Sequence, residues 1–304
     1  MRTTLVALFA GLTLACTTAA PTVAPSPYAD TLVATASGDG TFAQLSELDR
    51  VTRANGGNRA TGEPGYDAAV DHVVAVLQKA GWRVTTPEFT LGDRRYRNVV
   101  AQSATGAPDR VVMAGAHLDS VPEGPGINDN GSGVATLLEI ATRMGGSPPV
   151  AGAVRLAFWG AEEIDFEGSQ GYVDALAPAE REAIDLYLNV DMTASPNPGY
   201  FVQGRGDDLA ARLTALGAVP DRLDFDGTSD YAPFVDAGIP SAGLLAGDAE
   251  EKSADQAERW GGTAGEVFDR CYHTACDDLD NIDRTALDRF TDAVAGSLAA
   301  LSTG

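Results

Sequence analysis

The sequence predicts a single α/β domain in which helices cover both faces of a mixed, mainly parallel β-sheet. Short apolar runs of strand length alternate with longer stretches in which apolar residues recur at helical spacing. Several of these apolar runs end in a polar loop, as buried parallel strands commonly do. The chain has 304 residues, of which 44% are hydrophobic, so it can bury one sizeable core.

The individual elements follow from periodicity and from turn residues. The first helix begins near Thr41, has Leu45, Leu48 and Val51 on one face, and ends before Gly56. The second spans residues 64–81, and the last has one apolar face over residues 283–301. Further helices are expected at residues 133–144, 169–176, 207–216 and 231–237, and strands at 82–89, 98–102, 111–116, 154–159, 186–190 and 241–245. No linker follows residue 40, so we expect one domain over residues 39–304.

The N-terminal residues 1–20 are typical of a secretory signal peptide. Arg2 is followed by an apolar core that is too short to span a membrane, and small residues come next. The alternative is a buried N-terminal helix. Residues 21–38 are rich in Pro, Ala, Ser and Thr and predict a flexible leader. Cys16 weakly resembles a lipoprotein cleavage site, but we expect it to be removed with the signal and the protein to be secreted without a lipid anchor.

The net charge limits the kinds of partner that the protein can bind, and the two remaining cysteines indicate the redox state of its compartment. There are 43 acidic and 21 basic residues, giving a net charge of -22, which argues against nucleic acid or an anionic membrane as a partner. No other stretch is long and apolar enough to span a membrane. Cys271 and Cys276 lie five residues apart, and in an exported chain this spacing favours a disulfide loop over a metal site.

Polar side chains follow several of the predicted strands at the points where the strands end. His117 and Asp119 end one apolar run, and Asp129 lies in the loop that follows. The other such residues are Glu162, Glu163, Asp191 and, in the cysteine loop, His273. Because the carboxyl ends of parallel strands meet at one edge of a sheet, we expect these side chains to lie together.

Two histidines and three carboxylates are a plausible ligand set for two Zn²⁺ ions, with one carboxylate bridging them. Of the adjacent pair Glu162 and Glu163, one would bind metal and the other would exchange protons with the attacking water. Asp119, two residues after His117, would orient the imidazole ring.

Simpler explanations exist for single residues. A lone histidine or an adjacent acid pair is often only a solvated surface feature. His72, on a helix among acids, is expected at the surface. Asn130 begins a glycosylation sequon, although its place inside the predicted site argues against that use.

Five motifs, in order along the chain, resemble those of the secreted di-zinc aminopeptidases, particularly the Streptomyces members. They are AHLDS with GINDNGSG, FWGAEE, NVDM, SDYAPF and CYHTAC, and the likeness extends from about Asn55 to the C-terminus. The resemblance implies a zinc exopeptidase fold of the phosphorylase/hydrolase-like type. It also implies two zinc ions and peptide substrates with a free N-terminus.

The resemblance assigns roles position by position. Asp129 would bridge both zinc ions, and the other ligands would be His117, Glu163, Asp191 and His273. Glu162 would be the general base and acid. Tyr272 would hydrogen-bond the oxyanion, although the residue alone suggests only a packed aromatic. The family also has a disulfide at Cys271 and Cys276.

The same resemblance places the substrate pocket and a second kind of metal. The family favours large apolar N-terminal residues, and the matching pocket positions are Met192, Gly227, Thr228 and Leu245. A close relative has Arg in place of Thr228 and Phe in place of Leu245, which puts the fine specificity in doubt. Some members bind calcium, and Asp288 and Asp292 match two of its ligands, with Asp39 nearby. The alternative is that both aspartates face solvent.

We therefore predict a secreted, monomeric zinc aminopeptidase. Two other enzymes on the same scaffold, a carboxypeptidase and a glutaminyl cyclase, remain alternatives. A carboxypeptidase would need a cation for the substrate carboxylate, and Arg205, Arg259 and Arg270 are the local candidates. A non-catalytic binding protein is a further alternative, but every ligand position is filled.

Overall fold

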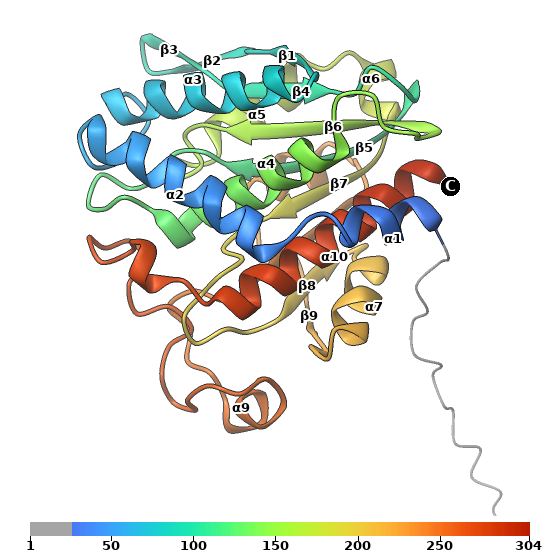
Figure 1. Ribbon diagram of the computed structural model, residues 1–304. Helices are drawn as coiled ribbons and strands as arrows, with labels where there is room; N and C mark the ends of the chain where they lie inside the picture. The colour runs from blue at the N-terminus through green and yellow to red at the C-terminus, as the bar shows by residue number, and fades with distance from the viewer. Residues whose placement is uncertain (1–25) are drawn as a thin grey trace, which may run out of the picture.

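An eight-stranded mixed sheet forms the centre of the computed structural model, which describes residues 26–304 (Figure 1). In spatial order the strands are β1 (Arg83–Thr85), β4 (Val99–Gln102), β6 (Gly152–Trp159), β5 (Ala107–His117), β7 (Ile184–Val190), β10 (Ser241–Leu245), β8 (Phe201–Gly204) and β9 (Asp221–Leu223). The four central strands β6, β5, β7 and β10 are parallel to one another. Strands β4 and β8 join them antiparallel on either side. The predicted mixed, mainly parallel sheet is therefore confirmed.

The strand register brings the predicted site residues to one edge. His117, the last residue of β5, is paired with Trp159, the last residue of β6. Leu244 of β10 is paired with Val190, the last residue of β7. Parallel neighbours that end together present their following loops side by side.

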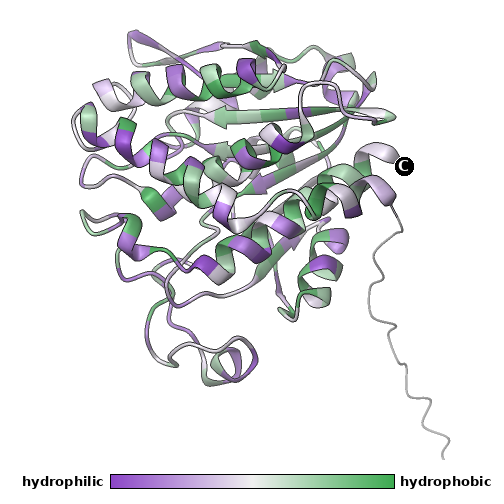
Figure 2. Ribbon diagram, in the orientation of Figure 1, coloured by the Kyte–Doolittle hydropathy of each residue, from purple (hydrophilic) through white to green (hydrophobic). Residues whose placement is uncertain are grey.

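Helices cover both faces of the sheet, as predicted. One face is covered by α1 (Pro27–Val33), α2 (Gly38–Ala54), α3 (Pro64–Lys79), α4 (Gly133–Met144), α7 (Asp207–Ala215) and α10 (Arg284–Thr303). The other face is covered by α5 (Glu167–Ala175) and α8 (Tyr231–Asp236). Alternate residues of β5 serve the two faces, because Val112 lies in the first core and Val111 in the second. Accordingly, the central strands in Figure 2 are mostly hydrophobic, whereas the helices carry hydrophilic residues as well.

The remaining elements are short. They are the hairpin β2 (Glu88–Leu91) and β3 (Arg94–Arg97), the helices α6 (Pro178–Glu182) and α9 (Ala254–Trp260), and the single turns η1 (Ile127–Ser132) and η2 (Leu279–Asn281). Helix α9 lies on an extended loop at the lower end of the view in Figure 1. No helix of residues 26–304 combines the length and the apolar character needed to cross a membrane.

The predicted flexible leader is wrong where the structure describes it. Ser26 caps helix α1, Pro27 occupies its first turn, and Ala29 and Leu32 are buried. Helix α1 packs against α10, the last helix of the chain (Figure 1). Pro, Ala, Ser and Thr are common in flexible segments, but they also begin and cap helices. Composition alone therefore could not distinguish the two. The predicted signal peptide and Cys16 lie outside the described residues.

The expected strand at residues 82–89 is divided in two. Pro87 separates β1 from β2, since proline cannot donate a backbone hydrogen bond to a neighbouring strand. The elements β3, β8, β9, α6 and α9 were not predicted. Each has seven residues or fewer, which is too short for a periodic pattern to show.

Replacing Leu32 with alanine tests whether α1 is part of the folded domain. Leu32 is only 2% exposed, so Leu32→Ala should lower the free energy of unfolding by about 2–4 kcal/mol. The control is Thr31→Ala, because Thr31 is exposed on the same helix and hydrogen-bonds only to Pro27 O. Urea unfolding followed by circular dichroism measures both variants. Equal, small losses would show that α1 does not stabilise the domain.

Candidate metal centre

The structure brings all five expected ligands together at the carboxyl edge of the sheet. They are His117 at the end of β5, Asp129 in η1, Glu163 after β6, Asp191 after β7 and His273 in the cysteine loop. His117 Nε2 lies 3.1 Å from Asp129 Oδ1 and 3.4 Å from Asp191 Oδ1. His273 Nε2 lies 3.1 Å from Asp129 Oδ2 and 3.0 Å from Glu163 Oε2. The two oxygens of Asp129 thus face different histidines, which is the arrangement that a bridging carboxylate requires.

The donor set fits divalent cations. The structure contains two groups of candidate ligands, and within each group the ligand atoms all lie within 4.8 Å of one another. One group is His117, Asp129 and Glu163, and the other is His117, Glu162 and Asp191. Glu163 Oε1 and Asp191 Oδ1 are buried and have no hydrogen-bond partner among the described residues. Buried carboxylate oxygens without a donor are costly unless a cation reaches them. Imidazole nitrogen with carboxylate oxygen is a combination that suits zinc.

The pKa values of both clustered histidines and of Glu163 are raised, so that protons offset the negative charge of the carboxylates. Burial alone would lower the pKa of His117, but the carboxylates of Glu162 and Asp191 raise it well above its usual value. Hydrogen bonds to Asp129 and Glu163 raise the pKa of His273 to about 10. Burial raises the pKa of Glu163 to about 7. Protons compensate the buried carboxylates here, and bound cations would take over that role.

Left-handed backbone conformations turn the chain at three of the site segments. Ala161 has φ 52°, Met192 has φ 46° and His273 has φ 56°. Such values are uncommon for residues with a side chain and persist where the surroundings hold them. Ala161 directly precedes Glu162, and Met192 directly follows Asp191. These turns present the acids at the sheet edge instead of continuing the strands.

The loop from β5 to η1 is held by a buried cation that was not predicted. Arg59 is fully buried and donates to the carbonyl oxygens of Leu118 and Gly126, each at 2.8 Å, and of Pro125. Gly126 has φ 59°, and a side chain there would come within 2.4 Å of Asp129 O. Glycine at this position therefore lets the loop fold closely on itself.

The side chain of Asn130 ties the same loop to β7. It is fully buried, its Nδ2 donates to Val190 O at 2.9 Å, and its Oδ1 accepts from Gly133 N and Met192 N. The sequon at Asn130 is therefore not available for glycosylation in the folded protein. The peptide bond between Asp129 and Asn130 is cis.

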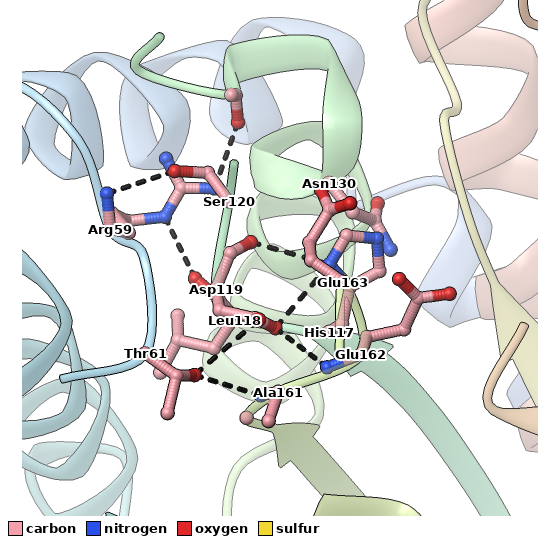
Figure 3. A network of polar contacts seen from close by, with 12 residues as sticks. Arg59, Thr61, His117, Leu118, Asp119, Ser120, Asn130, Ala161, Glu162 and Glu163 are labelled. Atoms are coloured by element: carbon pink, nitrogen blue, oxygen red, sulfur yellow. Dashed lines mark hydrogen bonds and ion pairs between the residues drawn. The ribbon is translucent and has the colours of Figure 1, made fainter. Parts of the chain in front are cut away.

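Asp119 contacts the site differently from the prediction (Figure 3). His117 Nδ1 lies 3.2 Å from the backbone oxygen of Asp119 and 3.7 Å from its carboxylate, so the backbone is the closer acceptor. The carboxylate instead accepts a hydrogen bond from the backbone N–H of Glu162 at 3.1 Å. Asp119 thus orients the segment that carries both glutamates as well as contacting the imidazole.

Thr61 completes this network and was missed by the sequence reasoning. Its Oγ1 accepts from Ala161 N at 2.8 Å and lies 3.4 Å from Asp119 Oδ2 (Figure 3). Thr61 lies in the loop before α3, about a hundred residues from Ala161, and no local spacing relates the two positions.

The cysteine loop is closed by a disulfide between Cys271 and Cys276, as predicted. The next residue, Asp277, accepts hydrogen bonds from Asn128 N at 2.7 Å and from Asp129 N at 3.0 Å. Burial raises the pKa of Asp277 to about 7, although these two donors lower it. The loop that carries His273 is therefore fastened to the loop that carries Asp129.

A cavity of ≈ 370 Å³ opens beside the cluster. Glu162 and Tyr272 line it, as do three of the four expected pocket residues, Met192, Thr228 and Leu245. Gly227 does not; it lines a neighbouring hollow with Phe166 and Phe225, so its assignment to this pocket is wrong. The lining residues that were not predicted include Phe201, Gln203, Leu223, Asp226, Leu244, Asp248, Glu250 and Phe268. Several come from β8 and β9, the short strands that periodicity did not reveal.

The expected calcium site is not supported. Asp288 Oδ1 accepts from Gly38 N at 2.6 Å and so caps the start of α2. Asp39 pairs with Arg284 at 2.7 Å. Asp292 is half-buried, and burial together with Asp288 raises its pKa to about 6. Neither Asp288 nor Asp292 belongs to a group of three or more candidate ligands within residues 26–304.

His72 is less exposed than predicted. It is half-buried, and its Nε2 is shielded from solvent without a hydrogen-bond partner among residues 26–304. Burial lowers its pKa. It lies on α3, outside the cluster at the sheet edge.

Comparison with known proteins gives a family match and close relatives. Residues 98–298 match the family described as Peptidase family M28. The chain is 47% identical to Leupeptin-inactivating enzyme 1 of Streptomyces exfoliatus over 272 residues, which is 86% of this chain and 61% of the relative. It is 50% identical over 244 residues to Probable lipoprotein aminopeptidase LpqL of Mycobacterium tuberculosis, covering 71% of this chain and 49% of the relative. The chain thus spans about half of the length of one relative and about three fifths of the other.

Solved structures show the same fold at low sequence identity. The Legionella pneumophila LapA aminopeptidase superposes with a TM-score of 0.74 and 17% identity over 91% of this chain and 75% of that chain. A glutaminyl cyclase of Porphyromonas gingivalis superposes with a TM-score of 0.70 and 20% identity over 86% of this chain and 97% of that chain. The fold is therefore shared by proteins named for two different activities.

Thr61→Val should weaken zinc binding by about tenfold or more, because hydrogen bonds to the segments that carry metal ligands hold those ligands in place. The substitution leaves the Ala161 N–H without its acceptor and frees the segment that carries Glu163. Thr61→Ser keeps the hydroxyl and is expected to stay within about threefold of the wild type. Chelator competition measures the zinc dissociation constants. Equal affinities for the Val and Ser variants would show that Thr61 does not support the metal ligands.

Proposed function

The chain belongs to peptidase family M28, and from this premise we propose that it is a zinc-dependent aminopeptidase that removes the N-terminal residue of peptides. The observation that carries the proposal is Asp129, whose two oxygens each face a different histidine at 3.1 Å. That geometry supports two adjacent metal ions. A site of this kind performs metal-assisted hydrolysis.

We propose that His117, Asp191, His273 and Glu163 would hold two zinc ions together with Asp129, whose two oxygens face the two histidines. Bound zinc would lower the pKa of the attacking water and polarise the scissile carbonyl group. The chain's own residues must then position the peptide and move the protons.

Glu162 is suited to the role of general base and acid. It lines the cavity and is 9% exposed, but it forms no ion pair with either histidine. Burial raises its pKa well above the usual value for a glutamate. A base of raised pKa can accept a proton from water and return it to the leaving amine. The hydrogen bond from its backbone to Asp119 holds it at the edge of the cavity.

Tyr272 is placed to donate a hydrogen bond to the oxygen of the substrate carbonyl. It lines the cavity, and its ring stacks on His273 with centroids 3.8 Å apart. Burial and the nearby carboxylate of Asp129 raise the pKa of its phenol, so the hydroxyl keeps its proton at neutral pH. A neutral donor of this kind stabilises negative charge as it develops on the oxygen.

The cavity supports an aminopeptidase over a carboxypeptidase. Its walls include Phe201, Leu244, Leu245 and Phe268, which suit a large apolar N-terminal side chain. No lysine or arginine of residues 26–304 lines it, including Arg205, Arg259 and Arg270, so a substrate carboxylate would find no cation there. A glutaminyl cyclase shares the fold and stays an alternative that only substrate tests can separate.

We also propose that the protein is a monomer exported from the cytoplasm. The disulfide between Cys271 and Cys276 suits an oxidising compartment, and one relative is named a probable lipoprotein aminopeptidase. Fractionation of a producing culture tests the location. The protein is expected in the medium or the cell envelope, and recovery from the cytosol alone would contradict export.

Glu162→Ala should lower kcat for leucine p-nitroanilide by about a thousandfold or more, because the variant lacks the proposed proton acceptor and donor. The variant should still bind two zinc ions, as elemental analysis would show, since Glu162 is not among the proposed ligands. The matched control is Asp165→Asn, an exposed acid in the same loop, which should keep wild-type activity. A Glu162→Ala enzyme of near-normal activity would refute this mechanism.

Substrates with free and blocked termini separate the three enzyme classes. We expect release of the first residue from a free-amine peptide, and at least about a hundredfold slower reaction once the amine is acetylated. Mass spectrometry identifies the products. Loss of the C-terminal residue would indicate a carboxypeptidase, and loss of ammonia from an N-terminal glutamine without peptide cleavage would indicate a cyclase.

A further inference from the structure

Gln203 is a buried polar residue in the wall of the cavity that the proposed mechanism does not use. It is 6% exposed, lines the cavity and makes no side-chain hydrogen bond to any residue from 26 to 304. In the sheet it is paired with Gly243 of β10 and Leu223 of β9. A side chain at position 243 would come within 2.5 Å of Gln203 Oε1, so Gly243 leaves the space that the amide occupies. A buried amide without a protein partner is available to a ligand.

The surfaces around Gln203 are apolar. Phe201 and Leu223 lie on the two adjoining short strands, and Leu244, Leu245 and Phe268 complete the lining on the other side. Such walls bury the methylene groups of a long side chain but offer nothing to a polar group at its end. Gln203 is therefore the polar contact within an otherwise hydrophobic part of the cavity.

Three acidic side chains that lie outside the metal cluster also line the cavity. They are Asp226, Asp248 and Glu250, and none forms an ion pair within the described part of the chain. Gly204, next to Gln203, lies against the ring of Phe225, next to Asp226, so the acid and the amide belong to neighbouring parts of the wall.

Asp226 is held in a fixed orientation with one oxygen to spare. Its Oδ1 accepts hydrogen bonds from Thr228 N at 3.3 Å, from Thr228 Oγ1 at 2.7 Å and from the hydroxyl of Tyr231. Its Oδ2 has no hydrogen-bond partner among residues 26–304. Partial burial alone would raise the pKa of Asp226, but these donors lower it, so the carboxylate is charged at neutral pH.

No lysine or arginine of residues 26–304 lines the cavity to neutralise these acids. Lys252 is buried, with its Nζ 5.8 Å from the centre of the Phe268 ring. Its ammonium group already donates to Pro198 O at 2.9 Å and to Gly261 O at 2.8 Å. The acids that line the cavity are thus left to attract a positively charged ligand.

We propose that the cavity accepts lysine and arginine as N-terminal residues, in addition to large apolar ones, and that Gln203 and Asp226 select them. This inference rests on the proposed aminopeptidase function. The methylene stem lies along the apolar walls, and the ammonium or guanidinium group donates to Gln203 Oε1 and to the free oxygen of Asp226. The same acids repel a substrate whose N-terminal residue is aspartate or glutamate.

The test compares kcat/KM for the p-nitroanilides of leucine, lysine, arginine and glutamate with the zinc-loaded full chain. Lysine and arginine are expected within about tenfold of leucine, and glutamate at least about a hundredfold below it. If the leucine p-nitroanilide is hydrolysed but kcat/KM for the lysine and arginine p-nitroanilides is more than about a hundredfold lower, this inference alone is overturned. If none of the four is cleaved, the aminopeptidase assignment fails as well.

Two variants identify the residues responsible. Gln203→Leu and Asp226→Asn should each lower the ratio of lysine to leucine kcat/KM by about tenfold, since each removes an acceptor for the cation. Asp226→Asn keeps an oxygen that accepts from Thr228 and Tyr231, so this variant should fold normally. It therefore tests the proposal even if the substitution of the buried Gln203 disturbs the fold. Asp224→Asn is the control: it removes the same charge from an exposed residue of the same loop that does not line the cavity. A ratio unchanged in both variants, or lowered equally by Asp224→Asn, overturns the assignment.

Discussion

One buried carboxylate, Asp129, faces two histidines at once, and much of the surrounding structure serves to hold it there. A carboxylate in the protein interior is stable only when charges and donors compensate it. The backbone N–H of Asp129 donates to the carboxylate of Asp277, and the loop around it is fixed by Arg59 through three carbonyl oxygens. Asn130 fastens the same loop to the end of β7. Three segments far apart in the chain thus converge on one loop.

This convergence links the metal centre to the fold around it. The acids at the sheet edge repel one another, and the raised pKa values of Glu163 and of both histidines show that protons relieve the repulsion when cations do not. Metal binding therefore replaces protons and stabilises the folded edge by mass action. The hydrophobic cores on the two sheet faces are built from apolar contacts, which need no cation.

The central strands and the ligands at their ends could be predicted because two local signals coincide there. An apolar run followed at once by His117 or by Glu162 marks both a buried strand and the edge at which it ends. Arg59, Thr61 and Asp277 gave no such signal, since each acts on a segment at least 58 residues away in the chain. Their roles follow only from the three-dimensional contact. The prediction of a calcium site was not supported for a related reason. The spacing of Asp288 and Asp292 fits a ligand pair, but the carboxylate of Asp288 binds the start of α2 instead.

The division between predictable and unpredictable residues follows the architecture of the sheet. Central strands are buried on both faces and paired on both sides, so exchanging their residues disturbs many contacts. The outer strands β8 and β9 are short, and Leu223 is exposed at the cavity. A change of side chain there disturbs fewer neighbours and alters the cavity directly. The proposed metal ligands thus follow the central strands of the sheet, whereas Phe201, Gln203 and Leu223, which line the cavity, lie on the outer strands β8 and β9.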